Sequence, residues 1–250
     1  MHALSQWKTY SIYFALALPV AAAGPALVVD RGLPQANLNN STGYRSNIRW
    51  SSYESGFLGD DFTVGAAGES WVIDSIRVWT VPGVHGRDPE NLGDSFQDVR
   101  LYFGDTKGGL SPVMTGLLKA GSSEPSNANI KISDATAAGG HFYEDFGSNL
   151  RVWQIDFTQL NLAVEGGAKY RFGTFGLGRP MGRAAKTNAW FNVATNAELA
   201  GVKQDGADGE MLVFTSGGKF ENVFDGKGAG WDKSSDINVQ VFAHRVDAGQ

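Results

Sequence analysis

The stretch WVIDSIRVWTV, at residues 71–81, is the clearest structural signal in the chain. Its side chains divide into two alternating sets, Ile76 and Val78 in one and Arg77, Trp79 and Val81 in the other. This period of two predicts a β-strand that turns one face toward a hydrophobic core. Residues 98–103 and 150–162 alternate in the same way, so we expect strands there as well.

Further strands are expected wherever short apolar runs are bounded by Gly, Pro, Asn, Asp or Ser. These runs are residues 27–30, 61–64, 130–133, 170–175, 190–193, 211–215 and 237–246. Helical patterns are few, and a helical turn is expected only at residues 112–119 and 196–200. We therefore predict an all-β fold, a single antiparallel β-sandwich of the jelly-roll type over residues 24–250. The 33 glycines fit the tight turns of such a fold.

The N-terminus has the layout of a secretory signal peptide. Lys8 supplies a positive charge, residues 10–22 are apolar except for Ser11 and Pro19, and small residues follow at 21–24. The apolar stretch is shorter than the ~20 residues that a membrane-spanning helix needs. We predict that residues 1–23 are removed on export, which leaves a secreted, extracellular protein without a membrane span.

Composition excludes several classes of protein. The net charge is -5, with 21 Lys and Arg against 26 Asp and Glu, which argues against a nucleic-acid partner. The chain has no cysteine, so disulfides, thiolate metal sites and cysteine nucleophiles are absent. With 12% aromatic and only 19% charged residues, the chain is not of the disordered type.

Several short segments occur in an order that resembles a known group of proteins. They are LGDDFTV at 58–64, WVIDSI at 71–76, VRLYF at 99–103, VWQIDF at 152–157 and the closing GWD at 230–232 with DINV at 236–239. The set resembles the uncharacterised β-sandwich domains of bacterial exoproteins, many of which carry a sorting tail of the PEP-CTERM type. The resemblance implies a fold and an extracellular location, but no reaction.

The C-terminal end departs from the members of that group that carry the tail. The chain closes on HRVDAGQ at residues 244–250, without a Pro-Glu-Pro signal, an apolar helix or a basic end. We therefore expect free secretion rather than sorting to the cell surface.

Catalytic motifs are scarce in the sequence. There is no G-x-S-x-G nucleophile elbow, and the histidines are too far apart to form a typical zinc or copper site. The best candidate for acid–base catalysis is GGHFYEDF at residues 139–146, which contains His141, Tyr143, Glu144 and Asp145. A polysaccharide lyase or a glycosidase could use these residue types, whereas a half-exposed hairpin, the favoured interpretation, needs no catalytic role for them.

Calcium is the most plausible metal, because it binds to oxygen ligands and suits extracellular sandwiches. The segment DGADGE, at residues 205–210, presents Asp205, Asp208 and Glu210 on a glycine-rich loop. The alternatives are a calcium site and a solvated acidic turn.

Aromatic side chains supply the main binding hypothesis, because an exposed aromatic face stacks on the apolar C–H surface of a sugar ring. Candidate residues are Trp79, Trp153, Trp190 and Trp231, of which Trp79 shares the face of Arg77 and could point outward. Arg45, Arg49, Arg179 and Arg183 lie in loop-like contexts and would either contact acidic glycans or solubilise turns.

The first functional hypothesis is therefore a non-catalytic β-sandwich that binds an extracellular polysaccharide or cell-surface glycan, or that has a structural role in a surface or matrix. The alternative is a carbohydrate-active enzyme built on residues 141–145.

Overall fold

The computed structural model describes most of the chain after the predicted signal peptide. The described residues are 24–33, 47–51, 57–83, 88–135, 142–145, 148–180, 188–195, 205–214, 219–224 and 236–246. The signal peptide and the expected helical turn at 196–200 lie outside them. Within these residues no helix is long and apolar enough to cross a membrane.

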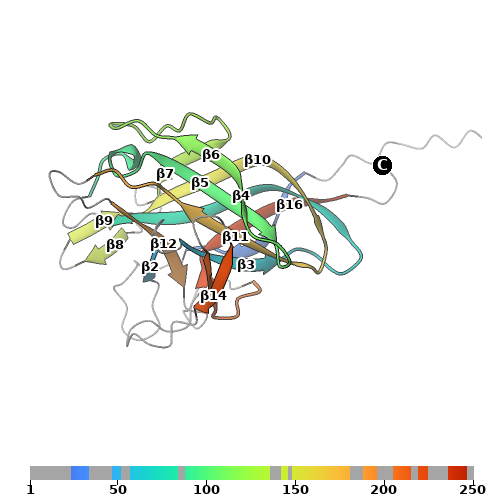
Figure 1. The fold of residues 1–250 in the computed structure, drawn as a ribbon. Coiled ribbons are helices and arrows are strands. Elements are labelled where there is room, and N and C mark those ends of the chain that lie inside the picture. The colour runs from blue at the N-terminus through green and yellow to red at the C-terminus, as the bar shows by residue number, and fades with distance from the viewer. Residues whose placement is uncertain are drawn as a thin grey trace, which may run out of the picture.

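Two antiparallel sheets face each other in a β-sandwich, which confirms the predicted fold class (Figure 1). The eight-stranded sheet contains β1 (Ala26–Arg31), β2 (Asn47–Ser51), β4 (Ser70–Gly83), β7 (Ile130–Asp134), β10 (Trp153–Glu165), β12 (Ala189–Thr195), β15 (Asp236–Ile237) and β16 (Val239–Val246). The six-stranded sheet contains β3 (Phe57–Thr63), β5 (Asp98–Asp105), β6 (Ser111–Leu117), β11 (Lys169–Phe175), β13 (Met211–Phe214) and β14 (Phe220–Phe224). A separate hairpin pairs β8 (Phe142–Asp145) with β9 (Ser148–Arg151), and a short 3-10 turn, η1, covers Leu92–Asp94.

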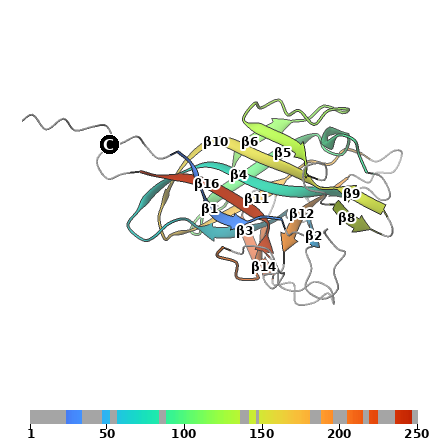
Figure 2. The same ribbon diagram turned by 180° about the vertical axis from the view of Figure 1, so that it is seen from behind.

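The strand order shows how the chain winds between the sheets. The main path of the eight-stranded sheet is β1-β16-β4-β10-β7, and the six-stranded sheet runs β14-β13-β3-β11-β5-β6. The strands β3, β4 and β5 follow one another in the chain but alternate between the sheets, so the chain crosses repeatedly from one sheet to the other. Figure 2 shows β16 and β4 side by side, with β10 beyond β4.

The main core lies between the two sheets and follows the alternation in the sequence. Ile76 and Val78 of β4 are buried there, at 0% and 1% exposure, against aromatic side chains of the facing sheet such as Phe62 and Phe172. The alternate side chains of β4 lie on the outer face of the sheet. Of these, Arg77 is half-buried, whereas Trp79 and Val81 are buried in a second, smaller hydrophobic cluster. Leu150 of β9 belongs to this second cluster, so the β8–β9 hairpin covers one end of the outer face.

The expected helical turn at residues 112–119 is wrong. Residues 111–117 form β6, an edge strand that pairs with β5 from Asp98↔Leu117 to Phe103↔Ser111. The polar and glycine-containing sequence SPVMTGL lacks strict alternation, since the strand is an edge with only Gly116 buried. Pairing with a neighbouring strand therefore overrides the weak local pattern.

Candidate functional site

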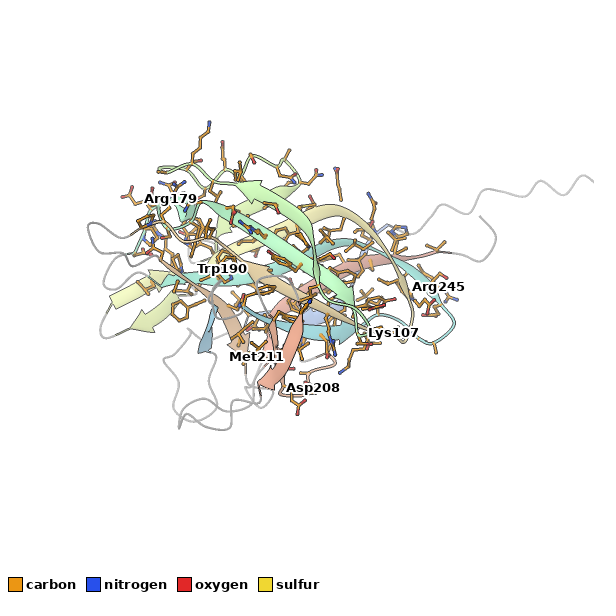
Figure 3. All side chains as sticks on the ribbon, in the orientation of Figure 1. Lys107, Arg179, Trp190, Asp208, Met211 and Arg245 are labelled. Atoms are coloured by element: carbon orange, nitrogen blue, oxygen red, sulfur yellow. The ribbon has the colours of Figure 1, made fainter. Side chains whose placement is uncertain are left out.

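The tryptophans proposed to bind sugar are core residues wherever the structure describes them. Trp79 and Trp153 are each 4% exposed and Trp190 is 1% exposed, so their ring faces pack against protein. Figure 3 labels Trp190 among the other side chains of the sandwich. Trp79 lies on the outer side of β4, as alternation predicted, but the second cluster buries it. The expectation that it faces solvent is corrected, and Trp231 lies outside the described residues.

Trp190 illustrates the structural role of these side chains. Its indole Nε1 donates to Asn192 Oδ1 at 3.0 Å, and its ring meets Phe96 edge-on with centroids 5.0 Å apart. Asn192 Oδ1 also accepts a hydrogen bond from the Thr174 hydroxyl of the opposite sheet at 2.8 Å. These contacts join the two sheets and leave no aromatic surface for a ligand.

The proposed acid–base residues fall on the β8–β9 hairpin. Tyr143 pairs with Leu150, Glu144 with Asn149 and Asp145 with Ser148, which confirms the hairpin interpretation for the backbone. His141 lies outside the described residues, as do the side chains of the other three. The catalytic hypothesis for this segment therefore stays a prediction.

The proposed calcium ligands lie on a loop at the edge of the sandwich, where Figure 3 labels Asp208. Asp205 Oδ2 accepts the backbone N–H of Asp30 at 3.0 Å. Asp208 Oδ1 accepts the N–H of Glu210 at 3.0 Å, and its Oδ2 lies 3.4 Å from the ammonium of Lys169. Lys169 Nζ is also 3.1 Å from Asp61 Oδ1, so a lysine charge lies between the two carboxylates. Among the described residues no three His, Asp or Glu side chains are grouped closely enough to hold a metal.

Beneath this loop is a buried ionic cluster that sequence analysis did not identify. Arg31 Nη1 lies 3.4 Å from Asp60 Oδ2 and 3.2 Å from Asp236 Oδ1, and all three side chains are 1% exposed. Arg31 Nη2 also donates to the Asp61 carbonyl. The three charges come from β1, β3 and β15, so the cluster joins the two sheets through the core.

Backbone N–H groups donate further hydrogen bonds to both buried carboxylates. The N–H groups of Asp61 and Ile237 donate to Asp60 at 2.7 and 2.6 Å, and those of Asp208 and Gly209 donate to Asp236 at 3.0 and 2.9 Å. Burial raises the pKa of Asp60 to about 8, although the Arg31 guanidinium opposes this rise. Burial likewise raises the pKa of Asp236. Because solvent does not reach these groups, the cluster holds the loop in place rather than contacting a ligand.

Arg179, one of the arginines considered for acidic glycans, also has a structural role. Its Nε donates to the Gly93 carbonyl and its Nη2 to the Leu118 carbonyl, both at 2.6 Å. The guanidinium thus connects the η1 turn with the end of β6, at the opposite end of the sandwich from Arg245 (Figure 3).

The outer face of the eight-stranded sheet is where polar side chains gather in an ordered array. One hydrogen-bonded row, which we call the polar row, crosses four strands. It consists of Asp30, Gln240, Arg77, Asp156 and Gln154. Arg77 lies at its centre, with Nε 2.5 Å and Nη2 3.3 Å from the two oxygens of Asp156. All five side chains are half-buried, so they are fixed in place but reach solvent.

A second row runs beside the polar row and contains a half-buried aromatic side chain, Phe242. The register pairs Leu27 with Phe242, Phe242 with Ser75, and Ser75 with Thr158, across β1, β16, β4 and β10. Phe242 is half-buried, and the Arg77 guanidinium carbon lies 5.6 Å from its ring centroid. Leu27 is 41% exposed beside it. The face therefore combines a half-buried ring with fixed hydrogen-bonding groups.

Sequence analysis predicted the strand that carries Phe242 but did not select this residue. The signal is present in VQVFAHRV, where Val239, Val241 and Ala243 are buried and Gln240, Phe242 and His244 are half-buried. Side chains two residues apart in a strand share a face, so the phenylalanine lies on the same face as the glutamine and the histidine. Polar neighbours of this kind indicate that the face, and its aromatic side chain, points toward solvent. All four candidate sugar-stacking residues of the sequence analysis are tryptophans, whereas the aromatic side chain on the solvent side of this strand is a phenylalanine.

No protein-family model, no curated protein and no solved structure matches this chain. The resemblance to exoprotein domains therefore stays a prediction, and the function is argued from the geometry of the chain itself.

Proposed function

We propose that this protein is a secreted, non-catalytic β-sandwich that binds an extracellular polysaccharide or cell-surface glycan on the outer face of its eight-stranded sheet. The observation that carries the proposal is Phe242, a half-buried ring in the strand row directly next to the polar row. In this arrangement one surface offers both kinds of contact that a sugar makes.

The aromatic contact is argued from the chemistry of sugars. The C–H groups on one side of a pyranose ring form an apolar surface that packs on an aromatic face. Phe242 offers such a face beside the exposed Leu27, and Arg77 holds the ring from one side at 5.6 Å. A planar side chain that is already ordered loses little conformational entropy when the sugar arrives.

The polar contacts come from planar side chains that are already oriented. Arg77 donates to both oxygens of Asp156, which also accepts from Gln154 Nε2 at 3.0 Å. Gln240 accepts from Arg77 and donates to Asp30 Oδ1 at 2.9 Å. Amide, guanidinium and carboxylate groups retain free hydrogen-bonding capacity at such positions, and they match sugar hydroxyls, which both donate and accept.

The predicted extracellular location of the protein agrees with a glycan as its ligand. The predicted signal peptide would deliver residues 24–250 to the extracellular space, where polysaccharides and surface glycans occur. The polar row holds two carboxylates and one guanidinium, and the net charge of the chain is -5, so the face offers no excess of positive charge to an acidic polymer. The arginine Arg179 is engaged with backbone carbonyls.

The test is a glycan array probed with residues 24–250, together with the variants Phe242→Ala and Leu117→Ala. Leu117 is 63% exposed on β6 of the other sheet, so its loss removes apolar surface without touching the proposed site. We expect the wild type and Leu117→Ala to retain the same glycans, and Phe242→Ala to bind them about tenfold more weakly.

Two outcomes would overturn the proposal. Equal binding by Phe242→Ala and wild type would rule out the outer face as the binding site. An array on which no glycan is retained would rule out glycan binding as the function. Release of reducing ends or unsaturated products from polysaccharides would establish an enzyme instead of a binding protein.

A further inference from the structure

Irregularities in three strands of the eight-stranded sheet occur at the same level. The register of β1 against β16 shifts between Leu27 and Val29, and that of β16 against β4 shifts between Phe242 and Ala243. The register of β10 against β4 shifts between Thr158 and Leu162. Bulges of this kind re-aim side chains and are common next to binding sites. The shifts of β16 and of β10 against β4 lie directly beyond the row that contains Phe242, and the shift in β1 lies between that row and the polar row.

The bulge in β10 contains two residues in the left-handed region of backbone conformation. Gln159 has φ 56° and Asn161 has φ 51°, whereas the other described residues with positive φ are all glycines, such as Gly65 and Gly121. Asparagine tolerates this conformation, but glutamine adopts it at a steric cost that glycine would avoid. The chain thus carries an amide side chain at a position where glycine would be more relaxed, and backbone strain of this kind is often found at functional sites.

A cavity of about 500 Å³ opens at this bulge. Its lining comprises Pro25, Asp74, Ser75, Thr158, Gln159 and Asn161. The volume lies within the roughly 300–1,000 Å³ typical of small-molecule sites. Ser75 and Thr158 also belong to the row of Phe242, so the cavity is continuous with the proposed glycan-binding face.

One wall of the cavity is fixed by an imidazole. His244 Nδ1 lies 2.8 Å from Asp74 Oδ2, which orients the carboxylate. Thr158 Oγ1 donates to the Asn129 carbonyl at 2.8 Å, so its lone pairs are left to accept. Within the described part of the chain, no hydrogen bond engages Asp74 Oδ1, the Ser75 hydroxyl or the Gln159 side-chain amide.

We infer that this cavity binds one neutral sugar unit of the glycan, an inference that rests on the function proposed above. Residues with hydroxyl, amide and carboxylate groups line it together with a proline ring that offers an apolar wall, and this mixture matches the hydroxyls and C–H surface of a pyranose. The one charged group in the lining is the Asp74 carboxylate, and the lining contains neither lysine nor arginine, so a uronic acid would meet a like charge there. The site therefore selects neutral sugars over acidic ones.

The experiment follows amide resonances of ¹⁵N-labelled residues 24–250 while single sugars are added at millimolar concentration. Glucose, galactose and mannose serve as neutral probes, and glucuronate and galacturonate as acidic ones. We expect at least one neutral sugar to shift the amides of Asp74, Ser75, Gln159 and Asn161, and the uronates to leave them unchanged.

Gln159→Gly provides the matching variant. Glycine accommodates φ 56°, so the variant should fold with an equal or higher Tm and should bind the neutral sugar about tenfold more weakly. Leu117→Ala, on the other sheet, should keep the wild-type shifts. A lower affinity together with an unchanged or raised Tm identifies a ligand contact, which loss of folding would not produce.

The outcomes separate this inference from the proposed function. Uronates that shift the same amides, neutral sugars that shift none of them, or Gln159→Gly that binds like the wild type would each overturn the sugar subsite. If Phe242→Ala still weakens glycan binding on the array in those cases, the proposed function stands without the subsite. An array with no retained glycan would remove both.

Discussion

At the scale of single residues, the buried ionic cluster shows how charge is accommodated in this core. Arg31 is surrounded by two carboxylates, Asp60 and Asp236, at 3.4 and 3.2 Å, and all three are buried. One positive charge faces two acidic groups, so the fully ionised cluster would hold a net negative charge in a region without water. Holding a proton on one carboxyl relieves this excess, which agrees with the raised pKa of both acids.

The raised pKa of Asp60 predicts a specific pH dependence of stability. From about pH 4 to pH 8 the folded protein holds a proton that the unfolded chain has released, because the carboxyl pKa is about 8 when folded and 3.8 otherwise. The free energy of unfolding should therefore fall as the pH rises through this window and level off above it. We expect a loss of at least about 1.4 kcal/mol, the equivalent of one pKa unit, in urea unfolding curves.

Two variants test whether the pH dependence comes from Asp60. Asp60→Asn removes the titrating group, so its stability should depend less on pH even if the variant is less stable overall. Asp105→Asn changes an exposed carboxyl whose pKa is lowered by backbone N–H groups of Lys107 and Gly108, so its titration lies below the window and the slope should persist. A stability that rises across the window, or equal slopes in wild type and Asp60→Asn, would contradict the prediction.

At the scale of elements, the sequence predicts a strand wherever its apolar and polar side chains alternate clearly between the two faces. Residues 71–81 alternate, and the structure places Ile76 and Val78 in the main core and Arg77 on the outer face. Alternation assigns a residue to a face, but it does not reveal what covers that face. Trp79 shares its face with Arg77, yet the second cluster buries the tryptophan because Leu150 packs over that end of the sheet.

The loop at residues 205–210 offers an element-scale test of the calcium hypothesis. A calcium ion bound by Asp205, Asp208 and Glu210 only in the folded state would raise the Tm by roughly 5–10 °C at a hundredfold excess over its Kd. The measurement is thermal melting in calcium and in EDTA. Lys169, whose ammonium lies 3.4 Å from Asp208, opposes the ion by charge, so Lys169→Gln should enlarge the calcium-dependent rise.

Asp208→Asn is the control for that melt, because it removes a proposed ligand and should abolish the rise. Identical melting temperatures of the wild-type protein in calcium and in EDTA would rule out calcium binding at this loop. The loop would then be held by Lys169, by the backbone hydrogen bonds to Asp236 and by the hydrogen bond from Asp30 N–H to Asp205.

At the scale of the whole molecule, the fold was within reach of sequence analysis and the site was not. Strand periods are local, so residues 98–103 and 170–175 were predicted close to β5 and β11. The outer face instead depends on register between distant strands, since Phe242, Ser75 and Thr158 become neighbours only when β16, β4 and β10 pair. The buried contact of Arg31 with Asp236 joins residues 205 positions apart, which no local pattern reveals.

Export is the whole-molecule property on which the proposed function depends, because an extracellular glycan is accessible only to a secreted protein. Expression of the full chain in a bacterial host should release a protein whose intact mass is lower than 26.8 kDa by the mass of residues 1–23, with Gly24 as its first residue. The matched control lacks residues 1–23 and should stay in the cytoplasm. Unprocessed protein retained in the cells would contradict both the signal peptide and the extracellular ligand.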